Sequence, residues 1–244
     1  IVVPAFNEEA RLGETLDELS AFLSSQHWDW EIRVVDDGST DGTCRVADAR
    51  ARVDARITLQ REPHRGKGAA VKAGLMAARA PFRFICDADL SMPVSELPRF
   101  LPPRLEQFDV AIGSSEGAGA RRIGEPIVRH LAGRLFNFAV QRLSVSGIED
   151  TQCGFKMFSA SAIVAIFPLL QVDGWAFDIE VLSIAPLLAS TIRAVFVDQP
   201  GHHVAEAALL HLRKVPRVRG RRRFDRGLGP IATAPAGGDR GQRH

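Results

Sequence analysis

Two aspartates, Asp87 and Asp89, stand one residue apart at the end of an apolar segment that begins at Phe82. Alternate residues of an extended backbone share a face, so both carboxylates could face one divalent cation, which prefers hard oxygen ligands. A cation such as Mg²⁺ or Mn²⁺ can in turn hold a diphosphate, which suggests a nucleotide-sugar site at the carboxyl edge of an open α/β sheet. Paired acids also occur as turn caps and solvated loop residues, and the pattern alone leaves both interpretations open.

The rest of the chain alternates between short apolar segments and amphipathic ones, which predicts strands alternating with helices. Leu12, Leu16, Leu19 and Leu23 recur at helical spacing after the first apolar segment. Strands are expected near 1–3, 31–36, 56–60, 82–87, 109–113 and 192–197, and the intervening helices include one over about 125–143. Such alternation implies a mainly parallel sheet with helices on both faces.

Five blocks of sequence carry most of the polar residues that could do chemistry. They read IVVPAFNEEARL (1–12), EIRVVDDGSTDGT (31–43), HRGKGAAVKAGL (64–75), GIEDTQCGFKMF (147–158) and WAFDIEVL (175–182). In this order they resemble the family-2 glycosyltransferases, in the branch that makes polyprenyl-phosphate and dolichyl-phosphate sugars. The blocks DTQCGFK and WAFD are most similar to its dolichyl-phosphate β-glucosyltransferase members, and the resemblance covers about residues 1–200.

The resemblance implies a GT-A-type fold and an inverting transfer of a hexose, glucose from UDP-glucose, to a polyprenyl or dolichyl phosphate. Three alternatives stay open. One is mannosyl transfer from GDP-mannose to the same lipid. Another is transfer to a soluble or polysaccharide acceptor, which the DTQCGFK block disfavours. The third is a nucleotide-sugar-binding homologue with little turnover.

The same resemblance assigns roles to individual residues. It implies that Asp89 coordinates the cation and that Asp87 binds the donor or the metal. The predicted donor-binding residues are Pro4, Ala5, Phe6 and Glu8 for base and ribose, Asp36 and Asp37 for uracil, and Lys67 for phosphate. The predicted reaction-centre residues are Asp150, Gln152 and Lys156, with Trp175 and Asp178 near the sugar.

Several of these residues have simpler explanations. Glu8 could be an acid of the first helical turn, and the same holds for Asp178. Asp36 or Asp37 could cap a turn, with Gly38 and Ser39 starting the next helix. The segment around Lys67 is not a P-loop, because Arg61 stands where the Walker motif has its first glycine.

One position departs from the family pattern. Relatives commonly have Gly-Ser-Arg where this chain has Gly113, Ser114 and Ser115, so an arginine expected near the diphosphate is missing there. The candidates to replace it are Arg121, Arg122 and Arg129, of which Arg122 and Arg129 are the preferred phosphate contacts.

Composition indicates one globular catalytic domain, residues 1–213, followed by a basic tail, 214–244. The tail holds one Lys and eight Arg against two Asp, whereas the chain as a whole has a net charge of only +2. Its Gly, Pro and Arg content predicts disorder. Contact with anionic lipid headgroups is an alternative, and a frame change near Gly201 would also explain the shift in composition. Nucleic-acid binding is not expected, because no stacking aromatic residues accompany the basic ones.

The expected location is cytoplasmic, peripheral at the cytoplasmic face of a membrane, because the implied acceptor is a lipid. The sequence contains no run of about 18 or more apolar residues, so it does not predict a membrane-spanning helix. Three cysteines without CxxC spacing argue against a disulfide framework or zinc site and favour a reducing compartment. No signal peptide is recognised, and residues preceding Ile1 could be missing.

Overall fold

The computed structural model describes residues 1–90, 92–103, 108–114, 153–188 and 190–196, which all belong to one compact unit, Ile1–Leu212. Its helices are α1 (Leu12–Ser24), α2 (Thr43–Val53), α3 (Lys67–Ala77), α5 (Ala160–Ile166) and α6 (Phe177–Leu187), with 3₁₀ helices η1 (Val94–Phe100) and η2 (Phe167–Leu169). Its strands are β1 (Val2–Ala5), β2 (Ile32–Asp36), β3 (Ile57–Arg61), β4 (Phe82–Ile85), β5 (Val110–Ser114), β6 (Lys156–Ser159) and β7 (Ile192–Phe196).

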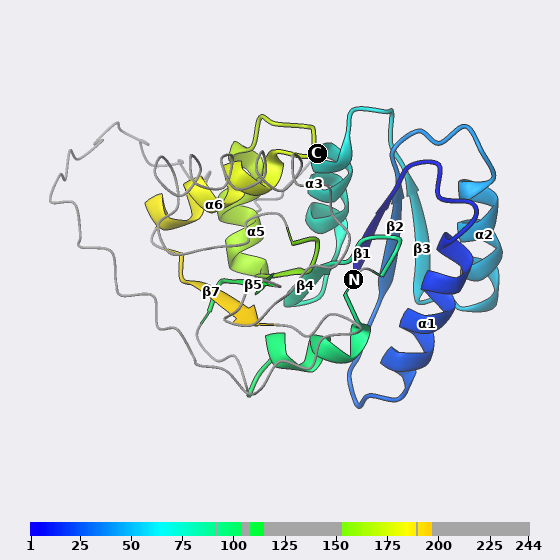
Figure 1. The fold of residues 1–244 in the computed structure, drawn as a ribbon, viewed down its shortest axis with the longest axis horizontal. Helices are drawn as coiled ribbons and strands as arrows, with labels where there is room; N and C mark the ends of the chain where they lie inside the picture. The colour runs from blue at the N-terminus through cyan, green and yellow to red at the C-terminus, as the bar shows by residue number, and fades with distance from the viewer. Residues whose placement is uncertain (91, 104–107, 115–152, 189, 197–244) are drawn as a thin grey trace, which may run out of the picture. The chain divides into compact units, whose positions relative to one another are not determined.

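These strands form one sheet in the order β3-β2-β1-β4-β6-β5-β7 (Figure 1). The neighbours β3, β2, β1 and β4 run parallel, as do β5 and β7. Only β6 is antiparallel to its two neighbours, β4 and β5. The predicted α/β fold with a mainly parallel sheet is therefore confirmed.

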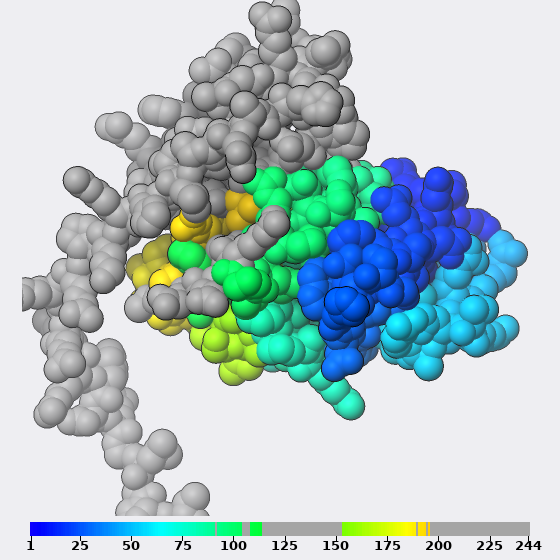
Figure 2. Space-filling view, turned by 90° about the horizontal axis from the view of Figure 1, so that it is seen from below, coloured from blue at the N-terminus to red at the C-terminus, as the bar shows by residue number. Residues whose placement is uncertain are grey.

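Helices cover both faces of the sheet, as a parallel sheet requires. On one face α1, α2 and η1 pack against the sheet, and the four leucines predicted as a stripe, Leu12, Leu16, Leu19 and Leu23, are all buried there. Figure 2 views the molecule from the side on which the blue surface of α1 adjoins the green surface around η1. On the other face α3, α5 and α6 enclose a second apolar core. The result is three layers, with the sheet in the middle (Figure 1).

The six predicted strands are all present, with small shifts in their ends. The strand predicted over 82–87 ends at Ile85, and a turn that begins at Asp87 follows it. The strand β6 was not predicted. Its residues Lys156–Ser159 begin inside the motif block GIEDTQCGFKMF, for which only a chemical role was predicted. The helix expected over 125–143, the boundary at residue 213 and the tail 214–244 lie outside the described residues.

Candidate functional site

The segments that follow β1, β2 and β4 meet at one edge of the sheet because these three strands are parallel neighbours. Ala5 at the end of β1 is in register with Asp36 at the end of β2. The main-chain oxygen of Ala5 accepts a hydrogen bond of 2.9 Å from the amide of Asp37. Pro4 and Ala5 therefore contribute backbone geometry that sets the position of Asp37, and the Ala5 side chain is buried.

Asp37 joins the end of β2 to the loop before α3. Its buried carboxylate accepts hydrogen bonds of 2.9 Å from the amides of Arg65 and Gly66. The Nδ1 atom of His64 lies 2.9 Å from the same carboxylate and 2.9 Å from the main-chain oxygen of Asp37. A carboxylate can accept about four hydrogen bonds, and Asp37 uses this capacity to hold the loop before α3 in place.

Asp36 has a different local task. Its buried carboxylate accepts hydrogen bonds from the amides of Gly38 and Ser39, at 3.2 to 3.3 Å. Gly38 has a φ of +76°, which confirms the predicted turn. The next helix does not begin there, however, since α2 starts at Thr43. Asp36 is therefore a turn residue, which is the simpler of its two sequence interpretations.

An aromatic pair lies beside these carboxylates. The rings of Phe6 and His64 stack with centroids 4.2 Å apart and an interplanar angle of 18°. The Phe6 residue is 43% exposed, and 58% of the His64 side chain is exposed. The stacked pair thus presents partly exposed aromatic rings to solvent at this edge of the sheet.

Glu8 was predicted to contact the donor ribose, with a first-turn helix acid as the alternative. The structure places it before α1, where its main-chain oxygen accepts from the amides of Arg11 and Leu12. Its carboxylate lies 2.7 Å from the Arg11 guanidinium, and its amide donates to the Thr43 hydroxyl over 2.8 Å. Glu8 precedes the helix rather than forming its first turn, so that alternative is wrong.

Asp87 and Asp89 do not continue the strand that leads to them. After Ile85 the chain turns, with the amide of Leu90 donating to the main-chain oxygen of Asp87 over 3.2 Å and Leu90 itself at a φ of +46°. The Thr15 hydroxyl of α1 donates to the main-chain oxygen of Ala88 and ties the turn to the domain. The strand alternation expected to aim both carboxylates is therefore wrong, and a turn positions them instead.

Lys67 lies against Asp87. Its Nζ atom is 2.6 Å from Asp87 Oδ1, with 34% of the lysine side chain and 27% of the aspartate side chain exposed. Lys67 is the first residue of α3, directly after Gly66. Gly66 has a φ of +121°, and a Cβ there would lie 2.6 Å from the main-chain oxygen of Asp173. Only glycine fits this conformation and this close approach, which brings the loop before α3 against the loop before α6.

Lys156 and Asp178 form a second ion pair, and it is buried. The Lys156 Nζ atom lies 2.8 Å from Asp178 Oδ1, and the two side chains are only 1% and 7% exposed. Burial raises the pKa of the Asp178 carboxyl above its usual value, and the Lys156 ammonium and then that of Lys67 oppose this rise. The two residues are 22 positions apart in the chain and belong to different motif blocks, and the fold joins them.

The chemistry of the carboxylates suits a divalent cation of the predicted kind. Asp89 is exposed, and both it and Asp87 offer hard oxygen donors. Within the residues that the structure describes, no group of three His, Cys, Asp or Glu side chains gathers into a complete metal site. A Mg²⁺ or Mn²⁺ ion at these aspartates would complete its ligands with phosphate oxygens and water, as Mg²⁺ commonly does in proteins.

Four predicted site residues, Asp150, Gln152, Arg122 and Arg129, lie outside the described residues. Trp175 is 62% exposed in the loop before α6. Sequence reasoning quoted the segment that contains His64 without assigning that histidine a part. Its position two residues before Gly66 in this loop was the available signal.

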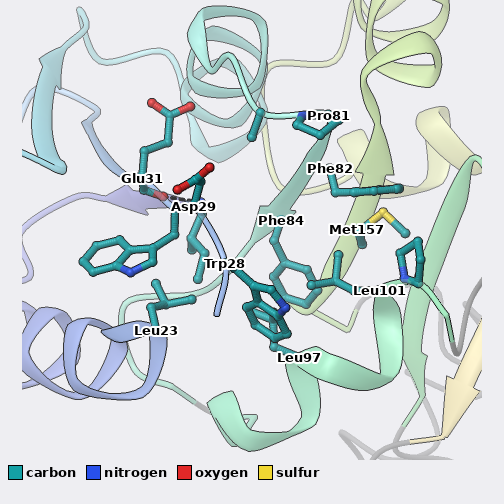
Figure 3. A pocket seen from close by; sticks show the side chains of 14 residues that line it. Leu23, Trp28, Asp29, Glu31, Pro81, Phe82, Phe84, Leu97, Leu101 and Met157 are labelled. Atoms are coloured by element: carbon teal, nitrogen blue, oxygen red, sulfur yellow. Dashed lines mark hydrogen bonds between the residues drawn. The ribbon is translucent and has the colours of Figure 1, made fainter. Parts of the chain in front are cut away.

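A hollow of about 330 Å³ lies elsewhere, near the amino-terminal ends of the parallel strands (Figure 3). Trp28 and Phe84 point into it, with Leu97 and Met157 alongside, and Glu31 stands at its rim. None of the residues that line it is a predicted site residue. The aspartate edge and this hollow are therefore separate features.

Comparison with known proteins gives the context of these residues. Residues 1–167 match the model of the family described as Glycosyl transferase family 2. A dolichyl-phosphate beta-glucosyltransferase of Dictyostelium discoideum is 33% identical over 214 residues, which cover 81% of this chain and 65% of that protein. The corresponding protein of Homo sapiens is 34% identical over 218 residues, covering 81% and 66%. The chain thus spans about 65% of the length of these curated relatives.

Solved structures give the same fold. Glucosyl-3-phosphoglycerate synthase from Mycobacterium tuberculosis in complex with UDP superposes with a TM-score of 0.59 at 22% identity, over 84% of this chain and 71% of that one. The same enzyme in complex with Mn²⁺, UDP and phosphoglyceric acid gives a TM-score of 0.60 at 22% identity, covering 80% and 66%. These likenesses identify the predicted GT-A fold.

Among the helices of the described residues, none is both long and apolar enough to cross a membrane.

Proposed function

This chain belongs to glycosyl transferase family 2, and from that premise we propose that it transfers glucose from UDP-glucose to a polyprenyl phosphate of the dolichyl type. The observation that supports this best is the meeting of Asp37, Lys67 and Asp87 at one sheet edge, where α/β folds bind ligands. The dolichyl-phosphate beta-glucosyltransferases that resemble this chain support the choice of sugar and acceptor.

The nucleoside end of the donor would bind at the first two strand ends. The exposed Phe6–His64 pair offers a flat surface for stacking of the uracil ring. The Asp37 carboxylate is buried, accepts hydrogen bonds from two loop amides and lies beside His64, so it would serve the uracil end of the site by holding this loop in place. Pro4, Ala5, Glu8 and Asp36 would shape this end of the site, largely through the backbone.

The diphosphate would bind beside Asp87 and Asp89, where Lys67 supplies a positive charge. Arg122 and Arg129 are the proposed additional phosphate contacts. A bound Mg²⁺ or Mn²⁺ would neutralise charge that develops on the departing diphosphate. Each charge-assisted contact to phosphate contributes on the order of 1.5 to 3 kcal/mol, so losing one would be measurable.

The transfer itself would proceed with inversion. An oxygen of the acceptor phosphate attacks the anomeric carbon, the bond from that carbon to the diphosphate breaks, and UDP leaves from the opposite face. The acceptor phosphate is already ionised near neutral pH, so it requires no strong general base. Alignment and electrostatic stabilisation would supply most of the rate enhancement. Asp150, Gln152 and Trp175 are proposed to line the region where sugar and acceptor meet.

Because the proposed acceptor is a lipid, we propose that the protein acts at a membrane surface. It would bind peripherally at the cytoplasmic face of that membrane.

The decisive experiment incubates the full chain with UDP-glucose, Mg²⁺ or Mn²⁺ and polyprenyl phosphate, and extracts lipid-linked sugar. The expected result is a glucosyl lipid that forms with UDP-glucose and not with GDP-mannose. Faster formation of a mannosyl lipid would instead favour the mannosyl alternative. Tight UDP binding without any lipid product would favour a binding protein.

Asp89→Asn tests the part of the proposal that concerns the cation. An amide is a weaker ligand than a carboxylate, so turnover should fall roughly a hundredfold or more. Because Asp89 is exposed, the melting temperature should stay close to that of the wild type. Full activity of the variant, or full activity of the wild type in excess chelator, would contradict the assignment.

A further inference from the structure

The carboxylate of Asp87 is held from two sides. Lys67 approaches Oδ1 to 2.6 Å. On the other side, a Cβ atom added to Gly154 would lie 2.0 Å from Oδ2 and 2.6 Å from the carboxyl carbon. No real Cβ contact is that short, so the backbone of Gly154 lies directly against this carboxylate. The position of Gly154 therefore determines where Asp87 can point.

Gly154 belongs to a short segment, residues 153–156, that Lys156 holds in place. The buried Nζ atom of Lys156, the first residue of β6, donates to the main-chain oxygen of Cys153, three residues earlier. The main-chain oxygen of Phe155 accepts from the amide of Gly113 over 2.8 Å. Lys156 itself pairs with Ile85 of β4, so the segment and the strand that leads to Asp87 are neighbours.

Asp178 ties this segment to α6, and α6 is tied to α3. The start of α6 lies against Gly68, where a Cβ would be 2.7 Å from the Phe177 Cβ. The amide of Ala69 donates to the main-chain oxygen of Asp173 over 3.1 Å. The helix that carries Lys67 and the helix that carries Asp178 are therefore held against each other.

We propose that Lys156 and Asp178 are positioning residues, whose buried ion pair acts through Gly154 to fix the Asp87 carboxylate, and that neither contacts the substrate. This inference rests on the proposed function, because it assigns Asp87 to the donor site. It replaces the reaction-centre role expected for Lys156 and the sugar contact expected for Asp178.

Burial explains why positioning is the role that fits this pair. A side chain that is 1% exposed has no surface to offer an incoming sugar or phosphate. Two of the three ammonium hydrogens of Lys156 are directed to Asp178 and to the Cys153 main-chain oxygen. The ammonium is thereby paired and hydrogen-bonded, which is the condition under which a buried charge is tolerated.

Gly154→Ala tests the contact with Asp87 directly, and Gly174→Ala is its matched control. A Cβ at Gly154 would displace the flexible Asp87 carboxylate, whereas at Gly174 it would meet nothing within 4 Å. Mn²⁺ affinity, measured by electron paramagnetic resonance with UDP present, should fall tenfold or more in Gly154→Ala, as is usual when the support of a ligand is disturbed. Gly174→Ala should bind Mn²⁺ like the wild type. Wild-type Mn²⁺ affinity in a folded Gly154→Ala would overturn the proposal.

Lys156→Met, made in the wild type and in Asp87→Asn, separates positioning from direct contact. If Lys156 acts through Asp87, UDP affinity in the presence of Mn²⁺ should drop in the wild-type background and show no further drop in Asp87→Asn. The same factor in both backgrounds would mean direct contact and would overturn the proposal. A variant that loses stability but keeps wild-type affinity when folded would also overturn it, since the role would then be structural only.

Amide hydrogen exchange at Gly154 and Phe155 distinguishes a failure of this inference from a failure of the proposed function. It needs neither metal nor donor. Faster exchange in Lys156→Met than in the wild type, localised to this segment, supports the positioning role even if the chain transfers no glucose. Unchanged protection in a folded Lys156→Met would contradict it even if glucose transfer is confirmed.

Discussion

Two lysine–aspartate pairs stand at the same edge of the sheet, and they differ mainly in burial. The Lys67–Asp87 pair, at 2.6 Å, keeps 34% of the lysine side chain and 27% of the aspartate side chain exposed. The Lys156–Asp178 pair, at 2.8 Å, is almost fully enclosed. Water can replace either partner in the first pair at little cost, but not in the second. The comparison teaches that the same chemistry can serve as an exchangeable ligand site or as a fixed support.

Electrostatics explains the difference. An exposed ion pair is screened and contributes up to about 1 kcal/mol to stability. A buried pair contributes less than its Coulomb energy suggests because both ions were desolvated, yet removing one partner leaves an uncompensated charge. The exposed pair should therefore be sensitive to ligands, and the buried pair sensitive to substitution.

The largest expected effect is on stability. Lys156→Met should lower the free energy of unfolding by about 3 to 5 kcal/mol, because it leaves Asp178 buried without its partner. Lys67→Met should change it by about 1 kcal/mol at most. Urea unfolding of both variants measures the contrast. The double substitution Lys156→Met with Asp178→Leu should recover much of the loss, and equal effects of the two single lysine variants would break the comparison.

The next effect is on donor binding. Lys67→Met removes a positive charge beside the proposed diphosphate site and should weaken UDP-glucose binding by roughly tenfold or more, since a charge-assisted hydrogen bond contributes about 1.5 to 3 kcal/mol. Calorimetry with Mn²⁺ present measures it. Arg50→Met is the control, because Arg50 pairs with Asp17 between α1 and α2 and not with a site residue. Unchanged affinity in Lys67→Met would mean that its pairing with Asp87 is only structural.

The smallest effect concerns pH. Because burial raises the pKa of Asp178, the folded protein keeps a proton on this carboxyl to higher pH than the unfolded chain does. Its contribution to stability is therefore fully present below the ordinary Asp value of about 4 and is lost as pH rises through the raised folded pKa. Unfolding free energies of wild type and Asp178→Asn, compared across that range, should show the wild type losing its relative advantage as pH rises. The opposite slope would mean that Lys156 outweighs desolvation.

Much of the fold was predictable because strands and helices have local signatures. The leucine stripe of α1 and the six apolar segments each predict an element from a period of a few residues. The meeting of the segments after Ala5 and Asp36 also follows from sequence, since parallel strands bring their carboxyl ends to one edge. The strand β6 escaped because it begins with Lys156, a charged residue that is buried only through its pairing with Asp178 of α6. The turn at Asp87 escaped because it depends on Thr15 of another element.

By itself, the sequence determined the alternation of elements, the family-2 motif blocks and the presence of acids and a lysine at strand ends. The tertiary structure alone decided which charges pair. It buried Lys156 with Asp178, left Lys67 with Asp87 partly in water, and set Gly154 against the Asp87 carboxylate. The physical reason is that a pairing between distant residues depends on strand order and helix packing, and the desolvation that distinguishes the two pairs exists only after the layers have closed around one of them.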